Sequence, residues 1–493
     1  MRVGTTPPPL VHSLRSQVSI LKVRLLLLLL LAPLLYSSVR QPDWGDDFAQ
    51  YLLQTRNIVE GRSMQDNGIV ADPALPAFAI PAYSVGFPLL LLPFYSSDPF
   101  RTAPYFIVPA LSLLLAAFAC FLLLRKRFGV TTSLLSALLI AYHPVFLQAK
   151  TELLSDLPFI AFLLLGLQAM ATEKEEPISR RNIVFAGLSF GLAMSMRLTG
   201  FLLLPTLLAW SVFDRSKRSA AGKIAGIALL LFAILNVVLF PIDLPGIWQF
   251  YRGAIAAQPL LLTDQFIFYL HQLNALFWIS PFSWTGALIV PGMLVYYWRK
   301  RDSLDAADWF LLAYAGLLMT IPYQGGGLRF LLPAIPLLLR NLLSLVRPFV
   351  LPVLQFRRYL HVAYAGIVLV LILPGIVDWL TTLERNDGPE SLEGKRILSI
   401  VEQKTPKDAV IICAKPRAIQ WYTGRRATYL IDGVLPARID SAFAQLNARY
   451  LICERTGRPG AFADDKMNAY LLSFGDRYVP VDSTKQLTLW LRK

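Results

Sequence analysis

The sequence predicts a polytopic α-helical membrane protein that ends in a soluble α/β domain. Of its 493 residues, 55% are hydrophobic and only 16% are charged, and the mean hydropathy is +0.52. A composition this apolar lies outside the range of soluble globular proteins. Apolar runs of roughly 17–22 residues, which match the thickness of a bilayer core, recur as far as Trp379 and then stop.

The apolar runs predict about eleven membrane spans. We place them at residues 20–37, 104–124, 131–149, 157–172, 182–196, 198–213, 224–240, 284–298, 309–322, 330–346 and 359–379. The segments that would then lie inside hold 21 of the 47 Lys and Arg residues, and the outer loops before residue 380 hold eight. Because cytoplasmic loops retain basic residues, this asymmetry predicts a cytoplasmic N-terminus and, with an odd number of spans, an extracytoplasmic C-terminus.

The basic residues raise two further interpretations. The net charge of +15 would suit a nucleic-acid partner, but the bases lie in short clusters between apolar runs, so we expect none. The leucine-rich core of the first span, Leu25 to Leu35, follows Lys22 and Arg24, and the segment resembles a secretory signal peptide. No small-x-small cleavage site follows it, and we therefore favour an uncleaved anchor.

Three sizeable segments are expected on the outer face, at 38–103, 241–283 and 380–493. The second is aromatic and amphipathic, which suits the membrane interface. Strand-like runs in the third lie at 409–415, 427–431 and 449–455 and are followed by RYVPV and LTLWL. We therefore expect a transmembrane domain over 1–379 and an extracytoplasmic α/β domain over 380–493.

The cysteines and short motifs point to no cofactor. Cys120 lies inside a predicted span and is expected to pack there. Cys413 and Cys453 occupy similar positions in two predicted strands, where a disulfide would fit, although two buried thiols are favoured. The chain has no Cys/His metal spacing, and the soluble domain has neither GxGxxG nor GxxxxGK[ST].

Acidic residues gather directly after the first span, in QPDWGDDFAQYLLQTRNIVEG (41–61). We expect Asp43 to cap a helix whose first turn contains Asp46 and Asp47 and which ends within 57–61. Acids at a helix N-terminus often do no more than complement the helix dipole. That explanation covers one or two of the three acids. It does not explain why they lie beside lipid headgroups, which repel negative charge. The alternative is that they serve catalysis.

Further charges are expected on the same outer surface. Glu152 and Asp156 would lie at i and i+4 on one helical face at the start of the fourth span, and Asp156 also fits an ordinary role as a helix cap. Arg197 and Arg329 adjoin apolar spans, where an arginine is usually paired or placed for an anionic group. Acids beside arginines at membrane level suit a lipid-linked phosphate and an acceptor hydroxyl.

Five segments carry a resemblance to a known group of enzymes. They are WGDDFAQYLLQTRNIVEGR, YSVGFPLLLLPFY, ELLSDLPFIAFLLLGL, MRLTGFLLLPTLL and LRFLLPAIPLLL. In this order they resemble the GT-C superfamily of integral-membrane glycosyltransferases, in the branch of protein O-mannosyltransferases, lipid A aminoarabinose transferases and RgtA-like enzymes. The resemblance covers residues 20–345.

The resemblance implies an inverting transfer of a sugar from a polyprenyl-phosphate donor to a hydroxyl of a glycan, lipid or protein. It also implies that the protein is integral to the bacterial inner membrane. The reaction would then take place on the outer face of that membrane, among membrane lipids. The base of this family lies in an Asp-Glu-x-x-aromatic pattern, and counting back four residues from Tyr51 gives Asp47. Phe48 stands where the family often has Glu, and Asp46 precedes, so the choice between the two aspartates stays open.

Roles in substrate binding follow from the same resemblance. Asp156 matches an acid associated with acceptor, metal or phosphate binding, and Arg329 matches a basic residue before the tenth span. The expected substrate-binding set is Asp156, Glu152, Arg329, Arg197, Tyr51 and Tyr83. A divalent metal serves some relatives only, so metal dependence stays open, and no other cofactor is expected.

Two other classes of function compete with an enzyme. A secondary transporter or a flippase for lipid-linked sugars would show buried charges at mid-membrane and inverted repeats. A non-catalytic assembly protein would use its C-terminal domain to bind a cell-wall partner. The charges gather at one face, no repeat is visible and the first outer loop is acidic, so we favour the glycosyltransferase.

Overall fold

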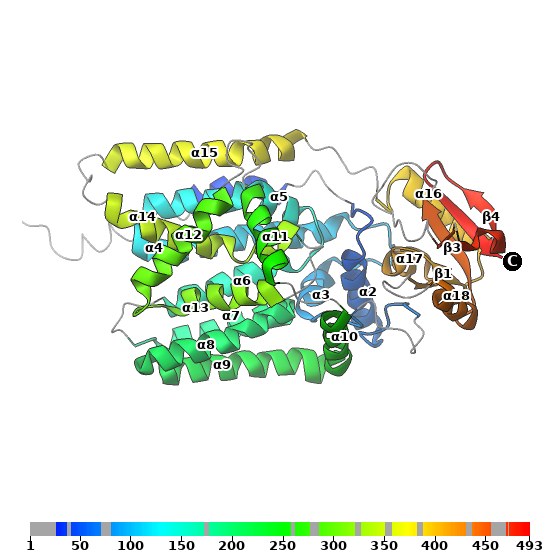
Figure 1. The fold of residues 1–493 in the computed structure, drawn as a ribbon, viewed down its shortest axis with the longest axis horizontal. Coiled ribbons are helices and arrows are strands. Elements are labelled where there is room, and N and C mark those ends of the chain that lie inside the picture. Colours follow the sequence, from blue (N-terminus) through cyan, green and yellow to red (C-terminus); the bar gives the residue numbers. More distant parts are fainter. Residues whose placement is uncertain are drawn as a thin grey trace, which may run out of the picture.

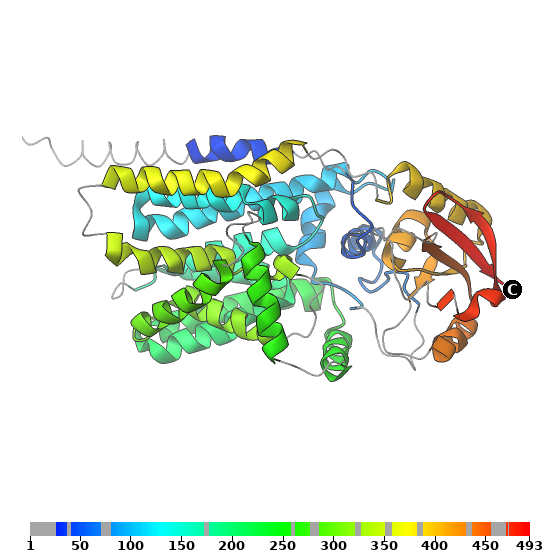
Figure 2. The same cartoon turned by 45° about the horizontal axis from the view of Figure 1, so that its top comes forward.

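The protein is an elongated helical bundle that carries a small mixed sheet beyond one end (Figures 1 and 2). The computed structural model describes residues 26–36, 41–70, 80–171, 177–257, 262–276, 285–320, 327–350, 357–381, 388–429, 436–454, 470–471 and 473–493. Lys22 and Arg24, the basic flank of the first span, lie outside these ranges. The C-terminus lies at the outer edge of the sheet, away from the bundle (Figure 1).

The described helices of the bundle coincide with the predicted spans. They are α4 (Ile107–Tyr142), α5 (Pro144–Lys150), α6 (Asp156–Met170), α7 (Arg180–Met196), α8 (Leu203–Phe213), α9 (Arg218–Ala233), α12 (Thr285–Lys300), α13 (Ala306–Thr320), α14 (Ile335–Val350) and α15 (Arg357–Thr381). Within the ranges that the structure describes, three helical stretches are long and apolar enough to cross a membrane: Ala103–Tyr142, Arg215–Leu239 and Leu360–Thr381. The helical architecture is confirmed, and the number of eleven spans stays a prediction.

Helix α4 consists of two helices that meet at Gly129. This residue has φ 78° and ψ 179°, a left-sided conformation that only glycine adopts readily. Lys126, just before it, donates to the carbonyl of Ala171 beyond the far end of α6. Helix α5, which follows α4, nevertheless lies at the same end of the bundle as α3, which precedes it (Figure 1). The chain therefore turns back at Gly129, as two spans joined by a turn at 125–130 require.

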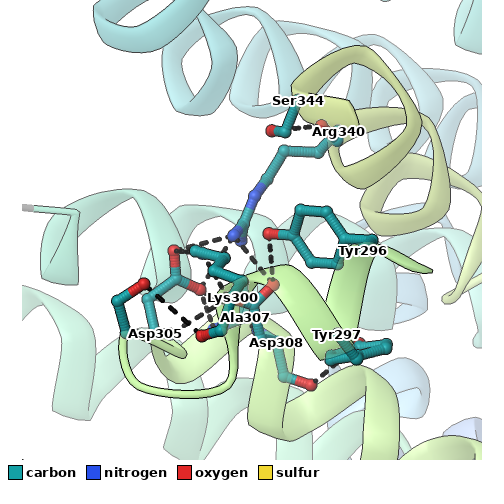
Figure 3. A network of polar contacts seen from close by, with 9 residues as sticks. Tyr296, Tyr297, Lys300, Asp305, Ala307, Asp308, Arg340 and Ser344 are labelled. Atoms are coloured by element: carbon teal, nitrogen blue, oxygen red, sulfur yellow. Dashed lines mark hydrogen bonds and ion pairs between the residues drawn. The ribbon is translucent and has the colours of Figure 1, made fainter. Parts of the chain in front are cut away.

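A buried ion network joins α12, α13 and α14 where α12 ends and α13 begins (Figure 3). Arg340 donates to Asp305 at 2.7 Å and to Asp308 at 3.1 Å. Lys300 and the Tyr296 hydroxyl donate to Asp308 at 2.5 and 3.0 Å. Asp308 is fully buried, and two basic groups face two acidic ones. Because the charges are matched, the network suits the fixing of three helices rather than the binding of an ion.

Helices α10 (Leu244–Ala257) and α11 (Leu262–Ala275) occupy the predicted second outer segment. Helix α10 lies across the end of the bundle (Figure 1). Its Trp248 is 69% exposed. An exposed tryptophan on a helix in this position suits the membrane interface, as the sequence predicts.

Among the described residues, the C-terminal sheet contains five strands in the order β2-β1-β3-β5-β4. They are β1 (Val410–Ile412), β2 (Arg426–Thr428), β3 (Ala448–Glu454), β4 (Tyr478–Ser483) and β5 (Leu487–Arg492). Strand β1 runs parallel to β2 and β3, whereas β5 runs antiparallel to β3 and β4. Every strand-like run named from the sequence overlaps one of these strands, because alternating β-branched and aromatic residues fit a half-buried pleated surface.

The helices of the same region are α16 (Leu392–Lys404), α17 (Pro416–Thr423) and α18 (Pro436–Gln445). Cys413 and Cys453 are buried and unpaired, which confirms the favoured expectation of two thiols. The Trp490 indole donates to the sulfur of Cys453 at 3.1 Å.

Candidate active site

The acidic stretch after the first span opens α2 (Asp47–Glu60). Asp46 occupies the N-cap position without capping through its side chain, and Asp43 accepts the backbone N–H of Gly45 at 2.9 Å. The expectation that Asp43 caps a helix containing both later aspartates is therefore wrong. Asp43 instead forms a local turn, as aspartate does readily ahead of a helix, and the helix begins at Asp47. It ends at Gly61 in a left-handed cap, as predicted.

Asp47 lies at the centre of a cluster of polar side chains. The Tyr83 hydroxyl donates to its Oδ1 at 2.6 Å, and Arg329 Nη1 donates to its Oδ2 at 3.0 Å. Arg329 Nε also donates to Asp156 at 2.8 Å, and Arg197 pairs with the other oxygen of Asp156. The side chain of Asp156 is only 3% exposed, whereas that of Asp47 is 38% exposed. Asp47 is thus the accessible carboxylate, and Asp156 anchors both arginines beneath it.

The turn between α5 and α6 places Glu152 differently from the prediction. Helix α5 ends at Lys150 and α6 begins at Asp156, so Glu152 lies in the connecting turn. The expectation that Glu152 and Asp156 share a helical face is wrong. Pro158 has no N–H to donate and suits the first turn of a helix, which is consistent with α6 starting at Asp156. Asp156 has no capping role either, because Ser155 takes the N-cap position.

A pocket of about 180 Å³ opens beside Asp47, between the segments 42–48 and 151–154. Its lining includes Asp46, Glu152 and Arg329. The pocket is therefore bordered by several carboxylates and a guanidinium. A polar substrate group of modest size would fit, and the partly exposed Asp47 carboxylate borders the space it would occupy.

Tyr51 and Tyr83 have different surroundings. Tyr51 is 5% exposed, its hydroxyl hydrogen-bonds Ser155 Oγ at 2.8 Å, and its ring packs on Tyr83 with centroids 5.0 Å apart. It thus joins α2 to the start of α6 below the pocket, and it is not among the residues that line it. Tyr83 instead donates directly to Asp47.

The segment 81–93 contains only a short helix, α3 (Gly86–Leu91), and a 3₁₀ turn at Leu92–Phe94. A Cβ on Gly86 would lie 2.6 Å from the carbonyl oxygen of Ser195, near the end of α7. Glycine therefore permits the close packing that brings the Tyr83 segment against the helix that ends beside Arg197.

The structure separates the two aspartates that the sequence left as alternatives. Asp46 Oδ1 accepts the backbone N–H groups of Arg417 and Ala418 at 3.0 and 3.4 Å, at the start of α17. Arg417 Nη1 also donates to the Tyr83 hydroxyl oxygen at 3.2 Å. From the sequence alone, no residue of the C-terminal region is expected at the site. A single Pro-Arg pair before a short helix carries no signal by itself.

The same surroundings shift the two carboxyl pKa values in opposite directions. Burial raises the pKa of Asp46 above its ordinary value, and Arg417 only partly offsets this. Burial also disfavours ionised Asp47, but the charge of Arg329, the Tyr83 hydrogen bond and Arg417 together hold the pKa of Asp47 below its ordinary value. Asp47 therefore stays ionised at neutral pH.

A divalent metal is not favoured by the donor set. Within the described ranges, no three or more His, Cys, Asp or Glu side chains group in a way that would hold an ion. Both oxygens of Asp156 accept from arginines, and those of Asp47 accept from Arg329 and Tyr83. Oxygens with such partners are poor ligands for a hard cation until the arginines move.

Comparisons with known proteins agree on the architecture. A family model described as dolichyl-phosphate-mannose-protein mannosyltransferase matches residues 99–240. The crystal structure of ArnT from Cupriavidus metallidurans bound to undecaprenyl phosphate superposes with a TM-score of 0.58 at 14% identity, over 94% of this chain and 97% of ArnT. The chain has the GT-C fold. The resemblance found in the sequence is thereby confirmed.

A second GT-C relative is the oligosaccharyltransferase of Archaeoglobus fulgidus. Its structure in complex with Zn and sulfate matches with a TM-score of 0.57 and 15% identity, over 88% of this chain and 68% of that one. Its complex with an inhibitory peptide and a dolichol-phosphate gives 0.54 and 14%, over 88% and 69%. No curated protein matches the sequence. At these identities the likeness establishes the fold alone.

Proposed function

We propose that the protein is a glycosyltransferase that moves a sugar from a polyprenyl-phosphate donor to a hydroxyl group on the extracytoplasmic face of the membrane. The observation that carries this proposal is the exposed, ionised Asp47 carboxylate beside the pocket, held by Arg329 and Tyr83. The GT-C fold supports it, because ArnT binds undecaprenyl phosphate and the archaeal enzyme binds a dolichol-phosphate in their structures.

Asp47 is the proposed general base. The acceptor hydroxyl attacks the anomeric carbon as the bond between that carbon and the phosphate oxygen breaks, and its proton passes to Asp47. The sugar then has inverted configuration, and the polyprenyl phosphate leaves as an anion. General base catalysis of this kind is typically worth about 10²–10⁴-fold.

Arg329 is the proposed contact to the donor phosphate. Its Nε and Nη1 donate to Asp156 and Asp47, and among the described residues none accepts from its Nη2. A guanidinium carries five donors in a planar fork, so Arg329 can hold Asp156 and still donate to a phosphate oxygen. Arg197, on the other oxygen of Asp156, adds positive charge where the leaving phosphate gains negative charge.

The donor class can be tested in membranes that contain the protein. Radiolabelled sugar should transfer from polyprenyl-phosphate donors, and Asp47→Asn membranes should serve as the blank. In a second arm, nucleotide sugars are supplied while synthesis of lipid-linked donors is blocked. Transfer that depends on the nucleotide sugar alone, or transfer that Asp47→Asn leaves intact, would refute the proposal.

A further inference from the structure

The C-terminal region reaches the candidate site through α17. This helix lies next to α2 in both views (Figures 1 and 2). Arg417, its second residue, has a side chain only 4% exposed. Its Nη2 donates to the carbonyl of Ile80 at 2.9 Å, and its Nη1 lies 3.6 Å from Asp46 and donates to Tyr83. The guanidinium is therefore held entirely by residues of the first outer loop.

The polarity of these bonds orients the Tyr83 hydroxyl. An arginine can only donate, so the Tyr83 oxygen must accept from Arg417. The single hydroxyl proton of Tyr83 is then left to point at Asp47 Oδ1, 2.6 Å away. A chain of donors in one direction, ending on a carboxylate, also strengthens each of its bonds.

Asp46 holds the backbone of the same residue. Its carboxylate accepts the N–H groups of Arg417 and Ala418, and these two belong to the first turn of α17, whose N–H groups have no partner within the helix. The backbone of Arg417 is thus tied to Asp46 while its side chain is tied to Tyr83. Neighbouring aspartates of one loop thereby contact the same arginine, Asp46 directly and Asp47 through Tyr83.

We propose that Arg417 is a positioning residue of the active site, through which the C-terminal domain orients Tyr83 and fixes the catalytic carboxylate of Asp47. This inference rests on the proposed function, because it assigns Arg417 a role in that reaction. It gives the soluble domain a part in the chemistry beyond that of an attached module.

Loss of Arg417 should change the titration of Asp47 in a defined direction. Arg417 is one of the groups that hold the pKa of Asp47 below its ordinary value. A base must be deprotonated to act, so activity falls as pH drops through the pKa of Asp47. Removing Arg417 raises that pKa, and the acid limb of kcat/KM moves to higher pH.

The test compares Arg417→Gln and Arg417→Lys with the matched control Arg425→Gln. Arg425 is part of the same domain and donates only to the carbonyls of Thr423, Glu402 and Thr405. We expect Arg417→Gln to lower kcat/KM by roughly 10–100-fold, as loss of an orienting neighbour does elsewhere, and to shift the acid limb upward. Arg417→Lys should restore part of both, and Arg425→Gln should change neither.

A double-mutant cycle separates positioning from mere docking. If Arg417 acts through Tyr83, then Arg417→Gln should cost much less in a Tyr83→Phe background than in the wild type. Equal losses in both backgrounds, or a loss with an unchanged acid limb, would overturn the inference.

A readout without turnover distinguishes this inference from the proposed function. Carbodiimides modify protonated carboxyl groups, so the pH dependence of Asp47 labelling, followed by mass spectrometry, reports its protonation. Arg417→Gln should move the labelling midpoint to higher pH, and an unchanged midpoint would refute the role of Arg417 even in an inactive preparation. Absence of transfer by the wild type from any polyprenyl-phosphate sugar would instead refute the proposed function.

Discussion

Asp46 and Asp47 are adjacent in the chain, yet the fold gives them opposite surroundings. The side chain of Asp47 faces Arg329, Tyr83 and the pocket, whereas that of Asp46 accepts the first N–H groups of α17. Consecutive residues at the start of a helix point in directions about 100° apart, because an α-helix has 3.6 residues per turn. The pair therefore divides into a candidate base and a contact to the C-terminal domain.

Substitution of the two aspartates should separate these roles. Asp47→Asn keeps the shape and removes the proton acceptor, so kcat should fall by about 10²–10⁴-fold while donor binding is retained. Asp46→Asn should retain most of the rate of the chemical step but weaken the contact with Arg417. Sugar transfer and donor binding in purified membranes measure both effects. Full activity in Asp47→Asn together with its loss in Asp46→Asn would reverse the assignment.

Arg329→Lys should impair the donor site although it keeps the charge. One ammonium group cannot donate at once to Asp47, Asp156 and a phosphate with the geometry of a planar guanidinium. Loss of one charged hydrogen bond costs about 1.5–3 kcal/mol, which corresponds to a fall in kcat/KM of roughly 10–150-fold. Steady-state kinetics with varied donor provide the measurement. Unchanged kinetic constants would remove Arg329 from the donor site.

At the scale of elements, short interruptions decide where the polar groups lie. The turn before α6 places Glu152 at the pocket and Asp156 beneath it, and the reversal at Gly129 returns the chain to the same end of the bundle. The site is thus built from helix ends. Elsewhere α12, α13 and α14 are joined by the network around Asp308, whose side chain is fully buried.

Removal of Asp308 should destabilise the bundle without touching the site. Asp308→Ala leaves Arg340 and Lys300 buried with fewer partners, which costs about 3–5 kcal/mol. The matched control is Arg301→Ala, because the pair formed by Arg301 and Asp302 is 68% and 92% exposed and such pairs contribute only about 0–1 kcal/mol. Thermal unfolding of the purified proteins in detergent compares them. Similar melting temperatures would show that the network contributes little.

At the scale of the whole molecule, the C-terminal domain and the first outer loop form one continuous contact. The segment 68–70 pairs with β2 through Val70 and Ala427, Trp421 donates to the carbonyl of Pro99, and Arg417 enters the site. A second buried polar junction lies where Thr102 and Tyr422 both donate to Glu390, at 2.6 and 3.0 Å.

The junction at Glu390 should make docking of the domain depend on pH. Burial raises the pKa of Glu390 to about 7, against the two hydrogen bonds and the charge of Lys395, while Asp98 adds to the rise. A carboxyl pKa raised in the folded state means that folding favours the protonated form. Its contribution is complete below the ordinary pKa of about 4.3 and is lost as pH rises through about 7.

We therefore expect the junction at Glu390 to lower the thermal stability of the protein as pH rises from about 5 to about 8. Glu390→Gln, which stays neutral, should flatten that part of the profile, whereas Glu393→Gln on the exposed start of α16 should not. Melting temperatures across this range provide the measurement. An identical pH dependence in Glu390→Gln and the wild type would contradict the assignment.

Orientation in the membrane is a prediction of the same scale. Alkaline phosphatase fused after residue 400 should be active, and a fusion after residue 218 should be inactive, because the charge asymmetry places them on opposite sides. Residue 218 begins α9, whereas residue 400 belongs to the domain that contacts Asp46. The reverse pattern would place Asp47 in the cytoplasm and exclude an extracytoplasmic donor.

The sequence by itself determined the fold class, most helix positions and the strands of the C-terminal sheet. These depend on hydrophobic runs and periodicity, which are local properties of a chain. It also pointed to Asp156, Arg197 and Arg329, because charges beside apolar spans are costly without a purpose, and to the pair Asp46 and Asp47 without choosing between them. The structure brings Asp47 into one cluster with Asp156, Arg197 and Arg329.

Only the tertiary structure decided which aspartate contacts Arg329 and Tyr83, where Glu152 lies and which residue of the C-terminal region reaches Tyr83. Asp46 and Asp47 have the same chemistry and differ only in the direction that the start of α2 gives them. Arg417 lies 371 positions after its hydrogen-bond partner Asp46 in the chain. Contacts of this kind leave no local pattern, because they depend on how parts of the chain that are distant in sequence pack against each other.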